Sequence, residues 1–131
     1  MGLMIDTCIF ISAEKENKSL NFNQWLEYGN ACISAITASE LLVGVYRADN
    51  EKKKVRRSAF VEAILSGLPI LNFTLETARI HAEISTYLIK QGRVIGAHDL
   101  LIAATALSHG CALLTHNQNE FKRVPGLRIL G

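Results

Sequence analysis

Short apolar runs alternate with longer amphipathic segments along the chain. Apolar runs of three or four residues are typical of strands buried on both faces of a sheet. They lie at residues 3–5, 31–34, 68–71, 111–114 and 127–130. Segments with apolar positions three and four residues apart predict helices. These segments cover residues 7–15, 22–28, 37–47, 52–65, 77–90 and 97–109.

The order of these elements predicts an α/β fold. Strands that alternate with helices are typical of a parallel sheet with right-handed crossovers and helices on both faces. Gly92 and Gly110 stand where two of the helices should end. We therefore expect one domain over residues 1–131, with a mostly five-stranded parallel sheet flanked by helices.

Composition agrees with a globular domain. The 131 residues are 49% hydrophobic and 20% charged, which excludes disorder and a coiled coil. No apolar run is long enough for a transmembrane helix, and no basic region precedes the first apolar stretch as in a signal peptide. Cys8, Cys32 and Cys111 are widely spaced and form no C-x-x-C pair. We expect free thiols in a cytoplasmic protein, with neither a zinc site nor a disulfide framework.

Positive charge is concentrated in one segment. The formal net charge is only +2, but six of the cations fall within residues 47–57. Such a run is either a solvated helix face or a patch that steers phosphate groups, and the sequence leaves both interpretations open.

Polar residues recur where predicted strands end, and ligands of open parallel sheets bind beyond the carboxyl ends of the strands. The residues near these ends, or at the start of the helix before the fourth strand, are Asp6, Thr7, Glu40, Asp99, Thr115 and Asn117. Several of these residues also have a local structural explanation that involves no ligand. Asp6 can cap a helix, Glu40 can form a capping box with Thr37, and Asp99 can interact with a helix dipole. Asn117 can be a turn residue.

A cluster of Asp6, Glu40 and Asp99 requires a cation. Two carboxylates about 4 Å apart repel each other by about 4 kcal/mol at an effective dielectric constant near 20. Without a metal, one of them should take up a proton instead. Carboxylate oxygens favour Mg²⁺ or Mn²⁺, and Mg²⁺ commonly completes its shell with water and substrate phosphate. The cluster therefore predicts phosphodiester chemistry.

Four stretches of the chain match, in order, the motifs of a known family. They are residues 4–7 (MIDT), 37–44 (TASELLVG), 97–104 (AHDLLIAA) and the segment from 113 to 127. On these stretches the sequence resembles PIN-domain ribonucleases, and among them the VapC-like toxins of bacterial toxin–antitoxin pairs. The resemblance covers essentially the whole chain.

The resemblance implies a five-stranded parallel sheet and a Mg²⁺-dependent endoribonuclease that cleaves tRNA, rRNA or mRNA and inhibits translation. It also implies a homodimer, a cognate antitoxin and a higher assembly with that antitoxin. By motif position, Asp6 and Asp99 are direct metal ligands, and Glu40 binds a second metal or orients water. The family's fourth acid falls on Asn117. Glu120 can contribute in its place if its segment is helical, so one or two metal ions remain open.

Other interpretations remain beside this one. Thr7 and Thr115 can hydrogen-bond phosphate or a metal-binding carboxylate, and His98 or His116 can act as a general acid or simply lie on an exposed rim. The Asn117 departure keeps a catalytically impaired protein that binds RNA or antitoxin under consideration. A phosphoryl-accepting receiver domain fits less well, because no aspartate follows the third strand. The acidic pocket also predicts that an antitoxin Arg or Lys and Mg²⁺ compete for it.

Overall fold

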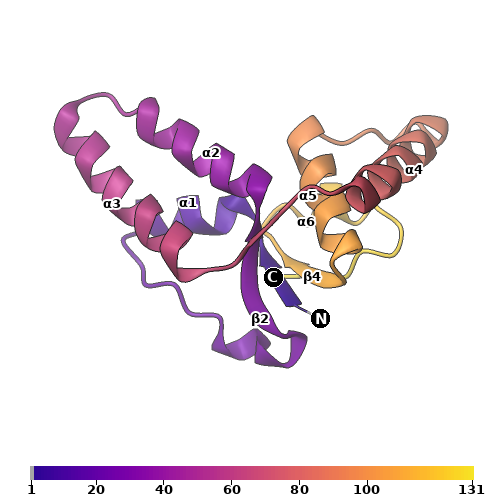
Figure 1. Ribbon diagram of the computed structural model, residues 1–131, viewed down its shortest axis with the longest axis horizontal. Helices are drawn as coiled ribbons and strands as arrows, with labels where there is room; N and C mark the ends of the chain where they lie inside the picture. Colours follow the sequence, from indigo (N-terminus) through magenta and orange to yellow (C-terminus); the bar gives the residue numbers. More distant parts are fainter. Residues whose placement is uncertain (1) are drawn as a thin grey trace.

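The computed structural model describes residues 2–131 and shows a five-stranded parallel sheet between two groups of helices (Figure 1). The strands are β1 (Gly2–Ile5), β2 (Asn30–Ser34), β3 (Ile70–Leu71), β4 (Cys111–Leu114) and β5 (Ile129–Leu130). Their order in the sheet is β3-β2-β1-β4-β5, and every neighbouring pair is parallel. The predicted α/β fold is confirmed, with β1 at its centre.

The helices divide into two groups in chain order. The first group is α1 (Thr7–Lys15), the 3₁₀ helix η1 (Asn23–Tyr28), α2 (Ala35–Tyr46) and α3 (Glu51–Gly67). The second group is α4 (Leu75–Gln91), α5 (Ala97–Ser108) and the short α6 (Gln118–Phe121). In Figure 1, α1, α2 and α3 lie on one side of the strands and α4, α5 and α6 on the other. None of the helices described is long and apolar enough to cross a membrane.

Side chains alternate between the two faces of the sheet, as strand geometry requires. Leu3, Ile5 and Ile33 pack in a cluster with Phe10 of α1, and residues of α2 and α3 join them. Met4, Cys32 and Leu113 point the other way and pack against Ile84 of α4 and Ile102 of α5. Burial on both faces explains why β1 and β4, at the centre of the sheet, carry no polar side chain apart from the Cys111 thiol.

Helix caps place the polar residues at the strand ends. The Asp6 side chain accepts from the Thr7 backbone N–H and caps α1. Asp6 therefore caps a helix and also lies at the carboxyl end of β1. At α2, the expected capping box of Thr37 and Glu40 is wrong. Ser34 caps this helix and accepts from the Thr37 backbone N–H, so α2 begins two residues earlier than predicted. Glu40 is thereby left free for long-range contacts.

Three other expectations need correction. Residues 23–28 form a 3₁₀ helix with a kink at Trp25, so the predicted helix over 22–28 is not an α-helix. Strand β3 covers only residues 70–71 because Pro69, which has no N–H, precedes it. Strand β5 covers only residues 129–130, and both of these shortened strands lie at the edges of the sheet, where pairing is on one side only.

Candidate active site

The sheet topology changes direction beside β1. The chain places β2 and β3 on one side of β1 and then places β4 on the other side, so the strand order reverses there. Open α/β sheets bind ligands at such a point, beyond the carboxyl ends of the strands. Asp6 follows β1 directly and Thr115 follows β4 directly, and the Asp6 backbone N–H donates to the Leu114 carbonyl at 2.9 Å.

Neutral donors hold the Asp6 carboxylate in one orientation. Oδ1 accepts from the Thr7 backbone N–H at 2.9 Å, and Oδ2 accepts from the Thr115 hydroxyl at 2.7 Å. The Cys8 thiol also donates to Oδ2, at 3.2 Å. Asp6 is only 4% exposed, so this carboxylate is both buried and orientated.

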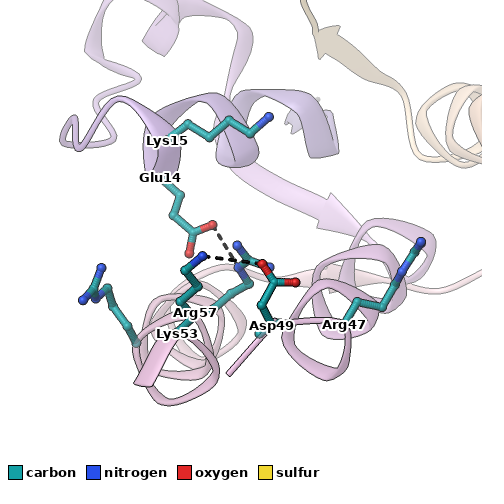
Figure 2. A pocket seen from close by; sticks show the side chains of 8 residues that line it. Glu14, Lys15, Arg47, Asp49, Lys53 and Arg57 are labelled. Carbon is teal, nitrogen blue, oxygen red and sulfur yellow. Dashed lines mark hydrogen bonds and ion pairs between the residues drawn. The ribbon is translucent and has the colours of Figure 1, made fainter. Parts of the chain in front are cut away.

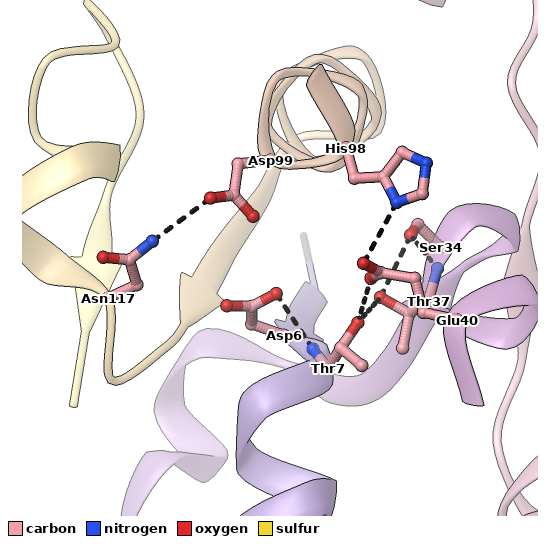
Figure 3. Close-up of polar contacts among 8 residues, drawn as sticks. All are labelled: Asp6, Thr7, Ser34, Thr37, Glu40, His98, Asp99 and Asn117. Atoms are coloured by element: carbon pink, nitrogen blue, oxygen red, sulfur yellow. Dashed lines mark hydrogen bonds and ion pairs between the residues drawn. The ribbon is translucent and has the colours of Figure 1, made fainter. Parts of the chain in front are cut away.

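Glu40 extends from α2 toward the same edge of the sheet as Asp6. The Thr7 hydroxyl donates to Glu40 Oε1 at 2.6 Å, and His98 Nδ1 lies 3.1 Å from Glu40 Oε2 (Figure 3). Behind this contact, the buried hydroxyls of Thr7, Thr37 and Ser34 form a chain of hydrogen bonds. The first turn of α1, the start of α2 and the start of α5 are therefore joined around Glu40.

Asp99 and Asn117 form a pair on the other side of Asp6, as Figure 3 shows. Asn117 Nδ2 donates to Asp99 Oδ2 at 3.1 Å, and the Asn117 backbone N–H donates to the Thr115 hydroxyl at 2.9 Å. Thr115 thus connects Asn117 to Asp6. Glu120 lies one turn further on, in α6, and its Oε2 is 3.5 Å from the Gly96 backbone N.

Negative charge in this region is not balanced by lysine or arginine. The pKa of Asp99 is raised to about 6, first by partial burial and next by the negative charge of Asp6. The charge of Glu120, a hydrogen bond with Glu120 and the charge of Glu40 act in the same direction. Among the residues described, none of these four acids forms an ion pair with Lys or Arg. We call Asp6, Glu40, Asp99 and Glu120 the acidic rim.

The acidic rim has the donor chemistry that a hard divalent cation prefers. Its ligands would be carboxylate oxygens. Burial is the largest cause of the raised pKa of Asp99, and the neighbouring negative charges, which a cation would offset, raise it further. In residues 2–131 no three His, Cys, Asp or Glu side chains are close enough to enclose an ion directly. A cation bound here would use one or two of these carboxylates and complete its shell with water, as Mg²⁺ commonly does.

Hydrogen bonds link Thr7 and Thr115 to Asp6, Glu40 to Thr7 and His98, and Asn117 to Asp99, whereas the His116 ring lies against Ser12. The expected helical placement of Glu120 is confirmed. Two contributors were missed, Cys8 and Ser34. Ser34 had a local signal, because it directly follows a strand and stands three residues before Thr37. Cys8 had none beyond its place in the first turn of α1.

Comparison with known proteins agrees with this geometry. The family model described as PIN domain matches residues 3–127, and the chain belongs to the PIN-domain family. The resemblance is thus confirmed, and a receiver domain is excluded.

Named relatives make the likeness more specific. The chain is 48% identical to Ribonuclease VapC1 of Rickettsia felis, over 99% of this chain and 96% of that protein. It is 35% identical to the tRNA(fMet)-specific endonuclease VapC of Shigella flexneri, over 98% and 96% of the two chains. A crystal structure of VapBC2 from Rickettsia felis bound to a promoter DNA fragment superposes with a TM-score of 0.87 and 32% identity, over 99% and 98% of the two chains.

Proposed function

We propose that this protein is a metal-dependent endoribonuclease and the toxin of a toxin–antitoxin pair. The observation that carries the proposal is the acidic rim, with its unbalanced charge, where the strand order reverses beside β1. Family membership and the ribonuclease names of the relatives support it. Transfer RNA is the first substrate to test, because one relative is named a tRNA(fMet)-specific endonuclease.

Asp6 and Asp99 are the proposed metal ligands, and Glu40 is proposed to hold a second ion or to orient water. A bound Mg²⁺ or Mn²⁺ would activate a water molecule and stabilise charge on the scissile phosphate. The contacts of Thr115 and Cys8 set the direction of the Asp6 carboxylate. The Thr7 hydroxyl and His98 hold Glu40.

Asn117 is assigned a positioning role. Its amide N–H already donates to Asp99, so it orients a carboxylate and adds no charge. Glu120 supplies the negative charge in its place, since its own charge raises the pKa of Asp99. Asp6 and Asp99 would hold one ion, and Glu40 or Glu120 would contribute to a second if two ions bind.

An antitoxin is the proposed partner. The acidic rim suits an Arg or Lys side chain, which would bind the same carboxylates as the metal. Antitoxin binding should therefore weaken as Mg²⁺ is added at constant ionic strength. We also infer a homodimer, a larger assembly with antitoxin and a cytoplasmic location, where the three free thiols would stay reduced.

Cleavage of tRNA and rRNA in the presence of Mg²⁺ tests the activity. Asp6→Asn should lower the cleavage rate by at least about 100-fold, by analogy with the loss expected when a metal site is disturbed. Asparagine also caps helices well, so this variant should fold. Glu27→Gln removes an exposed acid far from the rim in the sequence and should cleave like the wild type. Equal cleavage by Asp6→Asn, or with EDTA, would reject the proposal.

A second candidate is a protein that binds RNA or antitoxin without cleaving. The observation in its favour is the neutral Asn117 at the family's fourth acidic position. The same assay separates the two candidates. RNA binding without turnover, in Mg²⁺ and also in Mn²⁺, would support the binding protein.

A further inference from the structure

A hollow of about 260 Å³ lies where the ends of α1 and α2 meet the first half of α3 (Figure 2). Five of the chain's 14 lysines and arginines line it, from three separate segments. These five residues, which we call the basic hollow, are Lys15, Arg47, Lys53, Arg56 and Arg57. Glu14 and Asp49 are the two acids among them, so positive charge is in excess.

Only some of these cations form ion pairs or hydrogen bonds within the protein. Arg57 Nε lies 3.3 Å from Glu14 Oε1, and its Nη1 donates to the Gly44 carbonyl at 2.9 Å, which ties α3 to α1 and α2. Lys53 Nζ lies 3.5 Å from Asp49 Oδ2. The other three are exposed and make no ion pair within residues 2–131: Lys15, Arg47 and Arg56. These side chains are available to a ligand.

The basic hollow continues toward the acidic rim. A neighbouring hollow of about 180 Å³ shares Glu14, Lys15 and Arg57 with it and reaches Glu40. Glu40 lies in α2 and Arg47, seven residues later, caps the end of that helix, which places them about 10 Å apart at 1.5 Å per residue. They lie on the same side of the helix. A stacked strand advances about 3.4 Å per nucleotide, so this separation is about three nucleotides.

We propose that the basic hollow binds backbone phosphates of the RNA, about three nucleotides from the bond that is cut. This inference rests on the proposed ribonuclease function. An RNA whose scissile phosphate lies at the acidic rim carries further phosphates, which the rim itself repels. Cations beside the rim hold them, and arginine binds phosphate through paired N–H groups. With a net charge of only +2, the attraction for RNA has to be local.

The lining favours phosphate over an acidic peptide. Seven of the eight residues around the basic hollow are charged, and Ala48 is the exception. Peptide docking draws most of its affinity from apolar or aromatic anchors in buried pockets, whereas phosphate contacts need charge and hydrogen-bond donors. Exposed lysine and arginine side chains also reorient quickly and can follow a flexible backbone.

The test measures binding of a short fluorescein-labelled single-stranded RNA in EDTA. All proteins carry Asp6→Asn, so the RNA stays intact. The test variant adds Lys15→Gln, Arg47→Gln and Arg56→Gln. The control adds Arg79→Gln, Lys90→Gln and Lys122→Gln, three exposed cations outside the hollow with the same total change in charge. Thermal unfolding establishes that both variants fold.

Loss of three phosphate contacts should lower the slope of log Kd against log salt by about 2, between about 50 and 200 mM salt, and weaken binding about tenfold. The control should keep the slope of the Asp6→Asn parent. Equal slopes in test and control variants, or no measurable RNA binding by the parent, would overturn the proposal. So would a test variant that binds RNA normally but loses binding to a polyglutamate peptide, since this outcome assigns the hollow to an acidic peptide.

Cleavage by the otherwise wild-type protein separates this proposal from the function on which it rests. If that protein cuts RNA in Mg²⁺ and the two triple variants cut with equal KM, the phosphate site fails and the ribonuclease stands. If it cuts no RNA but the salt slopes differ as expected, the ribonuclease fails while the phosphate site stands. A rise in KM with unchanged kcat, seen only in the test variant, supports both the ribonuclease activity and the phosphate site.

Discussion

Glu40 of the acidic rim lies in α2 and Arg47 of the basic hollow caps the end of that helix, but the two regions hold their charges in different ways. In the rim, neutral hydroxyl, thiol and amide groups and one histidine contact the carboxylates, and burial together with the neighbouring negative charges raises the pKa of Asp99. In the hollow, Glu14 and Asp49 pair two cations and the remaining three are solvated. Partly buried like charges are destabilising until a counter-ion arrives, whereas solvated charges cost little and act at long range.

Thr115 offers the largest expected effect on the rim. Its hydroxyl donates to Asp6 and accepts from the Asn117 backbone N–H, so Thr115→Val removes a partner from two groups at once. We expect the free energy of unfolding to fall by about 2 kcal/mol, and cleavage to fall about tenfold or more as Asp6 loses its orientation. Urea unfolding and the cleavage rate measure these effects.

Thr105→Val is the matched control for this substitution. Thr105 is equally buried, but its hydroxyl donates only to the Leu101 carbonyl within α5. Its loss should lower the free energy of unfolding by less than about 1 kcal/mol and leave cleavage unchanged. Equal effects of the two substitutions would show that the Thr115 hydroxyl has no special role.

Asp99 gives a pH-dependent effect of intermediate size. Its pKa in the folded protein, about 6, lies above the ordinary aspartate value. The folded state therefore binds the proton more tightly, and stability falls as pH rises from about 4 to about 6 and stays lower above that range. Because Asp99 is partly exposed, we expect a loss of about 1 kcal/mol, which Asp99→Asn should remove while abolishing cleavage.

Thermal unfolding in EDTA at several pH values tests this expectation. At pH 7.5 Asp99→Asn should raise the melting temperature of the metal-free protein by about 3 to 5 °C, and near pH 4 the difference should vanish. Added Mg²⁺ should stabilise the wild type more than the variant. A lower melting temperature of the variant at pH 7.5 would instead indicate that the interaction of Asp99 with the α5 dipole dominates.

The smallest effects belong to the ion pairs of the basic hollow. Lys53→Gln breaks an exposed pair within α3 and its preceding turn, and should change the free energy of unfolding by no more than about 0.3 kcal/mol. Arg57→Gln also loses the bond to the Gly44 carbonyl and should cost about 1 kcal/mol. The midpoints of urea unfolding compare the two variants. Equal losses of unfolding free energy would contradict the structural role given to Arg57.

Much of the fold could be predicted from local patterns. The strand at residues 111–114 and the helix at 7–15 match the structure residue for residue, because continuous burial and helical periodicity leave a direct trace in the sequence. The edge strands and the kinked segment around Trp25 could not be bounded, since one-sided pairing and irregular turns leave a weaker trace.

The sequence by itself determined which acids follow which strands, and so which residues could meet at one edge of the sheet. Only the tertiary structure decided that Glu40 contacts His98 and Thr7, that Glu120 reaches Asp99, and that Lys15 joins the cations of α3. Caps and periodicity depend on residues within a few positions of one another. Contacts between residues 20 or more positions apart depend on strand order and helix packing, which no local pattern encodes.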